Sequence, residues 1–218
     1  MELMKINLGC GLQCPEGWIN IDSSFGVYIS KYPLLKKLLY FILPASLLPN
    51  IVWPKNTTWM DITKPFKFSS QSIDIIYSSH TLEHLTHIEA KIVFSECYRV
   101  MKKGAILRII VPDFEVLINQ YLENKNKNAE NAAYIFYKNS GYFEIAEPNN
   151  LRSLFKYYFQ RKNNHHFLYD EPGLKKQFSD AGFLEIKRMS FGISRINDLD
   201  AIENEARLNG SICIEAIK

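Results

Sequence analysis

Short apolar runs recur along the chain, and each ends in a glycine, a turn or a polar residue. Residues 73–77 and 105–111 are rich in apolar, β-branched residues, which is typical of strands buried on both faces of a parallel sheet. Shorter runs at 5–8, 18–22 and 58–62 predict three further strands. The pattern therefore predicts a sheet built mainly from parallel strands.

Helical spacing of apolar residues is found between the strands. It is clearest from about 86 to 101, and residues 102–104 (Lys-Lys-Gly) are typical of a helix end. Ser78 and Ser79 are predicted to cap the start of this helical segment.

Later segments continue the alternation of helices and strands. Residues 115–160 are predicted to be helical with a break near 147–150, and 170–181 to form a helix that ends at Gly182. The chain should close with strands at 184–191 and 211–217, which could pair as an antiparallel edge. We therefore predict the α/β class: a single domain, 1–218, with a doubly wound, mostly parallel sheet and an antiparallel C-terminal edge.

Composition agrees with one such domain. The chain has 218 residues, of which 47% are hydrophobic and 22% charged. The net charge of +3 is small and no block of like charges occurs, so nucleic acid is not an expected partner. The N-terminus lacks the pattern of a signal peptide, and the four cysteines form no C-x-x-C pair, which predicts a reduced, cytoplasmic protein.

Two cysteines lie close together in the sequence, Cys10 and Cys14. They would be half of a metal site, but no second pair or nearby histidine completes it. Buried thiols in a turn are the favoured interpretation, and the predicted site includes no metal.

Two segments do not fit the simple alternation. Residues 28–54 form an apolar insert, in which 33–44 resembles a short amphipathic helix, far below the roughly 20 residues needed to cross a bilayer. Three roles stay open for this insert: a lid or core element, a partner or dimer surface, and contact with a membrane surface. The helical insert at 115–165 is also predicted to serve as a lid or substrate element.

Polar residues and glycines follow four of the predicted strands. Gly9 and Gly11 come after the first strand, Asp22 ends the second, Asp61 belongs to the third, and His80 follows the fourth. Because the carboxyl ends of parallel strands meet at one edge of a sheet, these residues are predicted to form a ligand site there.

The motifs around these residues resemble class I S-adenosylmethionine-dependent methyltransferases, in particular a compact bacterial subgroup similar to methyltransferase type 11. The resemblance covers most of the chain and implies a link to surface-polysaccharide biosynthesis, which the residues themselves do not show. The matching segments are 8–11 (Leu-Gly-Cys-Gly), 17–22 (Gly-Trp-Ile-Asn-Ile-Asp), 61–66 (Asp-Ile-Thr-Lys-Pro-Phe), 77–84 (Tyr-Ser-Ser-His-Thr-Leu-Glu-His), 98–104, 111–113 and 166–170.

The resemblance implies a Rossmann-like fold and S-adenosylmethionine as cofactor, with S-adenosylhomocysteine as product. The backbone from Gly9 to Gly11 would face the methionine part of the cofactor, and Asp22 would hold the ribose hydroxyls. Asp61 and the amide of Ile62 would bind adenine. The other predicted cofactor-binding residues are Asn7, Cys10, Ser23, Ser79 and His80.

Two departures from the family pattern concern the glycine turn. Asn7 stands where many relatives have an acid, and the third glycine of the common turn is absent. The missing glycine and the early position of Asp22 also disfavour a nicotinamide cofactor, whose fingerprint needs G-x-G-x-x-G and an acid about 20 residues later.

The predicted function is methyl transfer to a small molecule or glycan precursor, by O-methylation. A hydroxyl acceptor needs a base, and the candidate catalytic residues are His80, Asp113 and His166. A carboxylate acceptor would need no base and a nitrogen acceptor only weak assistance, and the sequence does not distinguish these acceptors.

Two other functions stay open. One is a scaffold that binds the cofactor without transferase activity and uses the apolar insert as an interface. The other is a zinc hydrolase, because His80, Glu83 and His84 fit the H-x-x-E-H pattern. That motif belongs inside a helix, whereas His80 directly follows a predicted strand, which disfavours the hydrolase.

Overall fold

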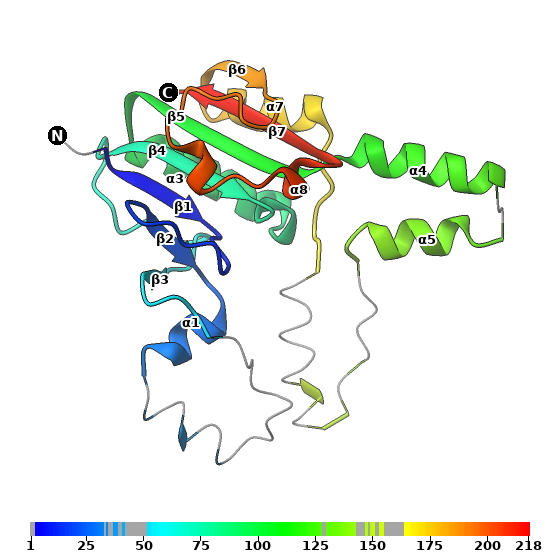
Figure 1. The fold of residues 1–218 in the computed structure, drawn as a ribbon, viewed down its shortest axis with the longest axis horizontal. Helices are drawn as coiled ribbons and strands as arrows, with labels where there is room; N and C mark the ends of the chain where they lie inside the picture. Colours follow the sequence, from blue (N-terminus) through cyan, green and yellow to red (C-terminus); the bar gives the residue numbers. More distant parts are fainter. Residues whose placement is uncertain are drawn as a thin grey trace.

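A seven-stranded sheet in the order β3-β2-β1-β4-β5-β7-β6 forms the centre of the protein (Figure 1). The computed structural model describes residues 3–32, 34, 37–38, 41, 52–127, 130–142, 147, 149–150, 153–154 and 164–218. The strands are β1 (Lys5–Leu8), β2 (Ile19–Asp22), β3 (Thr57–Trp59), β4 (Ile73–Ser79), β5 (Met101–Pro112), β6 (Leu184–Arg188) and β7 (Ser211–Ile217).

The direction of the strands confirms the predicted fold class. The pairs β1–β2, β1–β4, β2–β3 and β4–β5 are parallel. Strand β7 runs antiparallel both to β5 and to β6, so the C-terminal edge is antiparallel as predicted.

Helices and short 3-10 turns surround this sheet (Figure 1). They are α1 (Phe25–Ser30), η2 (Leu82–His84), α3 (His87–Val100), α4 (Phe114–Lys127), α5 (Ala132–Asn139), α7 (Glu171–Asp180), η3 (Leu199–Ala201) and α8 (Glu205–Leu208). The connection from β1 to β2 is a loop, and residues 9–18, all of them described, contain no helix.

The two faces of the sheet are covered differently. On one face, α3 and α7 bury apolar side chains such as Phe94 and Phe178, whose rings meet edge to face with centroids 4.9 Å apart. On the other face, the segment that contains η3 packs Ile196, Leu199 and Ile202 against strand residues. Side chains alternate between these two clusters along each central strand, because successive residues of a strand point to opposite faces.

Two predictions around α3 are wrong. Ser78 and Ser79 lie in β4 and cap no helix, because the strand continues to the edge of the sheet. The helix begins after Thr86, whose hydroxyl accepts from the Glu89 amide while the Glu89 carboxylate accepts from the Thr86 amide. This reciprocal capping box is a stronger start signal than two serines at the end of a strand. The 102–104 segment belongs to β5 and does not end the helix.

The two predicted inserts are described in part. Helices α4 and α5 extend away from the sheet as an arm (Figure 1), and Tyr121 contacts Phe136 across them with ring centroids 5.8 Å apart. Most of the predicted helix at 33–44 lies outside the described residues, as does part of the break near 147–150. Within the described parts of the chain, no helix is both long and apolar enough to cross a membrane.

Candidate functional site

The turn after β1 lies against the segment that follows β4. Gly9 has φ +68° and Gly11 has φ +54°, a region of backbone conformation that favours glycine. A Cβ atom on Gly9 would lie 2.0 Å from Oγ1 of Thr81, so no side chain fits there without displacing Thr81. The glycine at position 9 therefore lets the backbone of the turn pack directly against Thr81.

Asp22 ties this turn to the end of β2. Its Oδ2 accepts from the Gly11 amide at 2.9 Å, and its Oδ1 accepts from the Ser24 amide at 2.7 Å. The Asp22 carbonyl also accepts from the amide of Met60 at 3.2 Å, which joins the ends of β2 and β3. The carboxylate is 9% exposed, so its position is fixed by both the backbone and its burial.

Asp61 follows β3, although the strand itself ends earlier than predicted, at Trp59. One oxygen, Oδ1, accepts from the amide and the hydroxyl of Thr63 at 3.0 and 2.7 Å. Both of these hydrogen bonds from described residues use Oδ1, not Oδ2. Ile62 is buried in the core, and the carbonyl of Ser23 accepts from the Trp59 indole at 3.2 Å.

The side chains of Asn7 and Cys10 are buried beneath the glycine turn and contact residues of the turn and of β2. The amide group of Asn7 is buried and donates to the Gln13 carbonyl at 2.9 Å and to the Asn20 side chain at 3.2 Å. The Cys10 thiol is buried next to that of Cys14, with a distance of 3.5 Å between the sulfur atoms. Burial raises the pKa of Cys10 well above the usual range, so this thiol is not a nucleophile.

The sheet brings these residues to one place. Gly9, Gly11, Asp22 and Asp61 lie at the carboxyl ends of three neighbouring parallel strands, β1, β2 and β3. Ser79 is buried at the end of β4, the next strand in the sheet. The strand order reverses between β1 and β4, and ligands of open α/β sheets bind at such a switch point.

His80 follows β4 with φ +52°, and its ring has polar contacts with Arg207, Glu83 and the Ser211 hydroxyl. Its Nε2 lies 2.8 Å from the Arg207 carbonyl, and its Nδ1 lies 3.2 Å from Oε1 of Glu83. Burial alone would lower the pKa of His80, but the Glu83 carboxylate and the Arg207 carbonyl raise it above its ordinary value. The raised pKa favours the protonated ring, whose Nδ1 faces the Glu83 carboxylate.

The other two predicted catalytic residues lie in different surroundings. Asp113 is buried, and its oxygens accept from the Glu115 amide at 2.9 Å and from Arg188 at 3.1 Å. His166 is exposed, and its backbone amide donates to the Glu83 carbonyl at 2.6 Å. The fold therefore brings His166 close to the segment that holds His80, while Asp113 is fixed by an ion pair.

A histidine cluster surrounds Glu83, and the sequence predicted only part of it. Possible ligand atoms of Glu83, His84 and His165 all lie within 4.8 Å of one another. The rings of His84 and His165 meet edge to face with centroids 4.9 Å apart, and burial lowers the pKa of His165. His80 does not belong to this set, so the arrangement differs from that of an H-x-x-E-H hydrolase, in which both histidines of the motif bind the metal.

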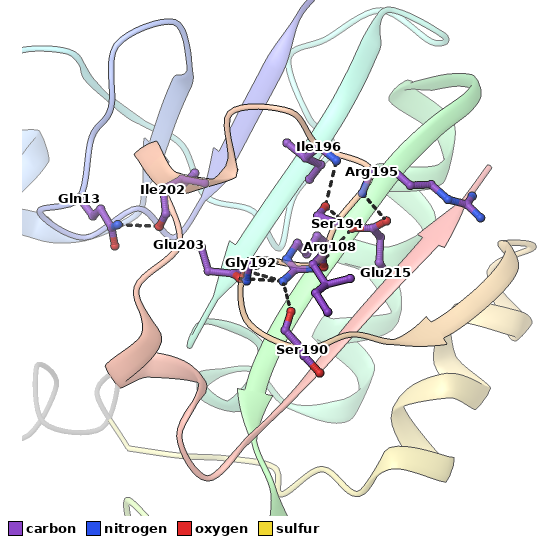
Figure 2. A network of polar contacts seen from close by, with 11 residues as sticks. Gln13, Arg108, Ser190, Gly192, Ser194, Arg195, Ile196, Ile202, Glu203 and Glu215 are labelled. Carbon is purple, nitrogen blue, oxygen red and sulfur yellow. Dashed lines mark hydrogen bonds and ion pairs between the residues drawn. The ribbon is translucent and has the colours of Figure 1, made fainter.

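A buried ion network on the other side of the sheet has no counterpart in the sequence predictions (Figure 2). Arg108 of β5 is completely buried and pairs with Glu203 through two bonds of 2.6 and 2.8 Å, and with Glu215 of β7 at 3.3 Å. The available signal was a single arginine inside the apolar run 105–111. A charge at such a position requires a buried partner.

The network also supports the candidate site indirectly. It fixes the segment that contains η3, and Gln13 of the glycine turn donates to the Ile202 carbonyl in that segment (Figure 2). The turn that carries Gly9 and Gly11 is therefore held from two sides, by Asn7 and by Ile202.

Comparison with known proteins agrees with this geometry. Residues 51–109 match a family model described as a methyltransferase domain. A SAM-dependent methyltransferase from Thermotoga maritima has a similar structure, with a TM-score of 0.50 and 17% identity over 100% of this chain and 83% of its own. A SAM-dependent methyltransferase from Archaeoglobus fulgidus gives a TM-score of 0.49 and 15% identity over 99% of this chain and 86% of its own.

A third similar structure is phosphoethanolamine N-methyltransferase 2 from Haemonchus contortus in complex with S-adenosyl-L-methionine. Its TM-score is 0.47, with 13% identity over 100% of this chain and 49% of its own. No curated protein sequence matches the chain significantly. At these identities, the likeness to the Thermotoga structure concerns the fold, while the family match covers β3, β4, α3 and most of β5. The chain is therefore similar to SAM-dependent methyltransferases in its fold and, over residues 51–109, in its sequence.

Proposed function

We propose that this protein transfers a methyl group from S-adenosylmethionine to a hydroxyl group of a small molecule or glycan precursor. The observation that carries the proposal is the fixed carboxylate of Asp22, bound by the Gly11 amide at 2.9 Å where β1 and β2 end side by side. Carboxylate oxygens can each accept more than one hydrogen bond, so Asp22 can bind ribose hydroxyls and keep its backbone partners.

The other cofactor contacts are proposed from the same edge of the sheet. Thr81 fills the space beside Gly9, whereas nothing lies within 4 Å of a Cβ atom added to Gly11, so the backbone at Gly11 is open to the methionine part of the cofactor. Oδ2 of Asp61 would accept from the exocyclic amine of adenine, and the Ile62 amide would donate to a ring nitrogen. Asn7 and Cys10 would act by shaping the turn, and Ser23, Ser79 and His80 would border the bound cofactor.

The sulfonium of the cofactor supplies an activated methyl group, so the protein mainly has to align the acceptor and exclude water. A hydroxyl acceptor must also lose its proton. His80 and His166 are the proposed bases, and Asp113 is the third candidate because Arg188 already occupies its carboxylate. The contacts that raise the pKa of His80 favour its protonated form, so His80 must release a proton before it can act as a base.

The proposal also specifies the acceptor of the methyl group, a hydroxyl of a small molecule or glycan precursor. It is supported by the resemblance to methyltransferases linked with surface polysaccharides, and membrane-surface or dimer contacts of the insert at 28–54 would suit a glycan precursor. The experiment is incubation of the protein with methyl-labelled S-adenosylmethionine and separate pools of sugars, alcohols, amines and carboxylic acids. Label in the hydroxyl pools that disappears in Asp22→Asn supports the proposal, whereas label only in amines or acids would contradict O-methylation.

Failure of every pool alongside tight cofactor binding would instead support a scaffold without transferase activity. The base is then tested with His80→Asn and His166→Asn, measured as kcat on the labelled acceptor. The variant of the true base should lose about 100-fold in kcat with little change in cofactor affinity. Unchanged kcat in both variants would exclude both histidines from this role.

A further inference from the structure

The carboxylate of Glu83 is an unusual group in this protein. Its side chain is 1% exposed, and among the described residues neither of its oxygens accepts an aligned hydrogen bond. The nearest charge is Nδ1 of His80, 3.2 Å from Oε1, in an ion pair without hydrogen-bond geometry. The pair with His80 gives Oε1 a charged neighbour but no hydrogen bond, and Oε2 accepts no hydrogen bond from a described residue. Because a buried carboxylate without hydrogen-bond donors is costly, this position favours a further cation.

Two imidazoles face the same carboxylate. The possible ligand atoms of Glu83, His84 and His165 lie within 4.8 Å of one another, and two ligands of one ion with bonds of about 2.1 Å can be at most about 4.2 Å apart. Ligands at tetrahedral angles around one ion lie about 3.4 Å apart, so side-chain shifts of about 1 Å bring all three within coordination distance.

The surroundings orient the two histidines as ligands. Nδ1 of His84 lies 3.2 Å from the Asn164 carbonyl, so it donates its proton there and leaves Nε2 with a free lone pair. Metal-binding histidines usually have this type of second contact, which fixes the tautomer. Nδ1 of His165 is buried and makes no hydrogen bond to a described group.

The backbone holds the cluster together from two distant parts of the chain. The Glu83 carbonyl accepts from the amides of His166 and Phe167 at 2.6 and 3.2 Å, which fixes the 164–167 segment against η2. The His165 amide donates to the Gly141 carbonyl at 3.2 Å. The three side chains are therefore positioned by main-chain contacts that do not depend on a metal.

We propose that Glu83, His84 and His165 bind one divalent transition-metal ion, for which Zn²⁺ is the probe. Two imidazoles and one carboxylate suit zinc, and this number of protein ligands leaves a coordination position open for a water or an acceptor oxygen. The site lies beside the candidate cofactor site, because Glu83 follows by two residues the Thr81 that contacts Gly9. Glu83 is a ligand here, in contrast to its role as a base in the H-x-x-E-H pattern.

The test is titration of the metal-stripped, full-length protein with Zn²⁺ in competition with a chromophoric chelator. The variants are Glu83→Gln and His165→Asn, and the matched control is His87→Asn, which removes an imidazole outside the cluster. We expect one Zn²⁺ per chain in the native protein and the control, and affinity lower by roughly 100-fold or more in the two cluster variants.

A second readout is the visible spectrum with Co²⁺, whose intense absorption reports low-coordinate nitrogen and oxygen ligation. It should appear in the native protein and be lost in Glu83→Gln while circular dichroism shows that the variant is folded. Absence of stoichiometric Zn²⁺ binding by the native protein, or undiminished binding by folded Glu83→Gln, would overturn the proposal. Since no methyl donor is used, neither result bears on the proposed methyl transfer.

Discussion

Two groups of buried carboxylates in this protein differ in one respect: whether their oxygens have donors. On one face of the sheet, Glu203 and Glu215 surround Arg108. Glu203 also accepts from the Gly192 amide at 3.1 Å, and Glu215 from the Ser194 hydroxyl and the Arg195 amide. At the edge of the sheet, Glu83 is equally buried, but among the described residues it has an ion pair with His80 and accepts no hydrogen bond through its side chain.

The comparison separates a structural role from a ligand-binding one. A buried carboxylate that is fully hydrogen-bonded has all its partners within the protein, and its removal leaves those partners without an acceptor. A buried carboxylate that lacks hydrogen-bond donors gains interaction partners for its oxygens only when a cation or another ligand binds. The Arg108 network should therefore determine stability, and the Glu83 cluster should determine binding.

The largest expected effect is the loss of Arg108. Arg108→Met leaves two buried carboxylates without their cation, so the free energy of unfolding should fall by about 3–5 kcal/mol. The control is Arg195→Met, because Arg195 pairs with Glu185 at the surface, where water screens the pair, and its loss should change the stability little. Urea denaturation of both variants measures the difference. Equal losses in the two variants would contradict a structural role for the network.

Gly9→Ala should give the next largest loss. The new Cβ would lie 2.0 Å from Oγ1 of Thr81, and alanine would adopt a φ that costs about 1–2 kcal/mol. Gly104→Ala is the control, because its φ is also positive but nothing lies within 4 Å of its added Cβ. The two variants share the cost of φ, so any extra loss of stability in Gly9→Ala reports the contact with Thr81. A thermal melt in which Gly104→Ala is the less stable variant would exclude that contact.

Glu83→Gln tests whether the Glu83 carboxylate, in contrast to the Arg108 network, contributes little to stability. In metal-free protein, the free energy of unfolding should change by less than about 1 kcal/mol, since no described residue donates an aligned hydrogen bond to the carboxylate. Denaturation beside Arg108→Met in the presence of a chelator provides the measurement. A loss of 3 kcal/mol or more would place Glu83 in the same structural class as Glu203.

The smallest effect concerns a carboxylate near the surface, Glu96. Arg99 and the Phe66 amide bind it and lower its pKa below the ordinary value. Its contribution to stability is therefore present above the unfolded-state pKa and is lost as the pH falls through the folded-state pKa. The acid side of the stability profile should be flatter in Glu96→Gln by a few tenths of a kcal/mol. Identical profiles for the native protein and the variant would contradict this contribution.

The sequence predicted the fold well because its signals are local. Apolar runs ending in Gly9, Asp22 and His80 identified the strands and the edge at which their ends meet. The start of α3 was placed wrongly at Ser78 because a strand end and a helix cap use the same residue types, and only the tertiary structure shows that β4 extends through them.

Contacts between distant residues could not be predicted from local patterns. The partners of Arg108 are separated from it by 95 and 107 residues, and His165 reaches Glu83 only through the packing of the 164–167 segment against η2. The prediction that the site includes no metal considered only neighbours in the sequence. The metal site that we propose instead consists of Glu83, His84 and His165, of which His165 is brought to the other two only by folding.

The most direct test of the account is calorimetric titration of the protein with S-adenosylhomocysteine. We predict one binding site per chain, with affinity lower by about 10–100-fold in Asp22→Asn because a charged acceptor of the ribose hydroxyls is lost. Asp180→Asn, which changes an exposed acid at the end of α7, should bind like the native protein. Absence of binding by the native protein, or equal affinity in folded Asp22→Asn, would contradict a cofactor site at the junction of β1 and β2.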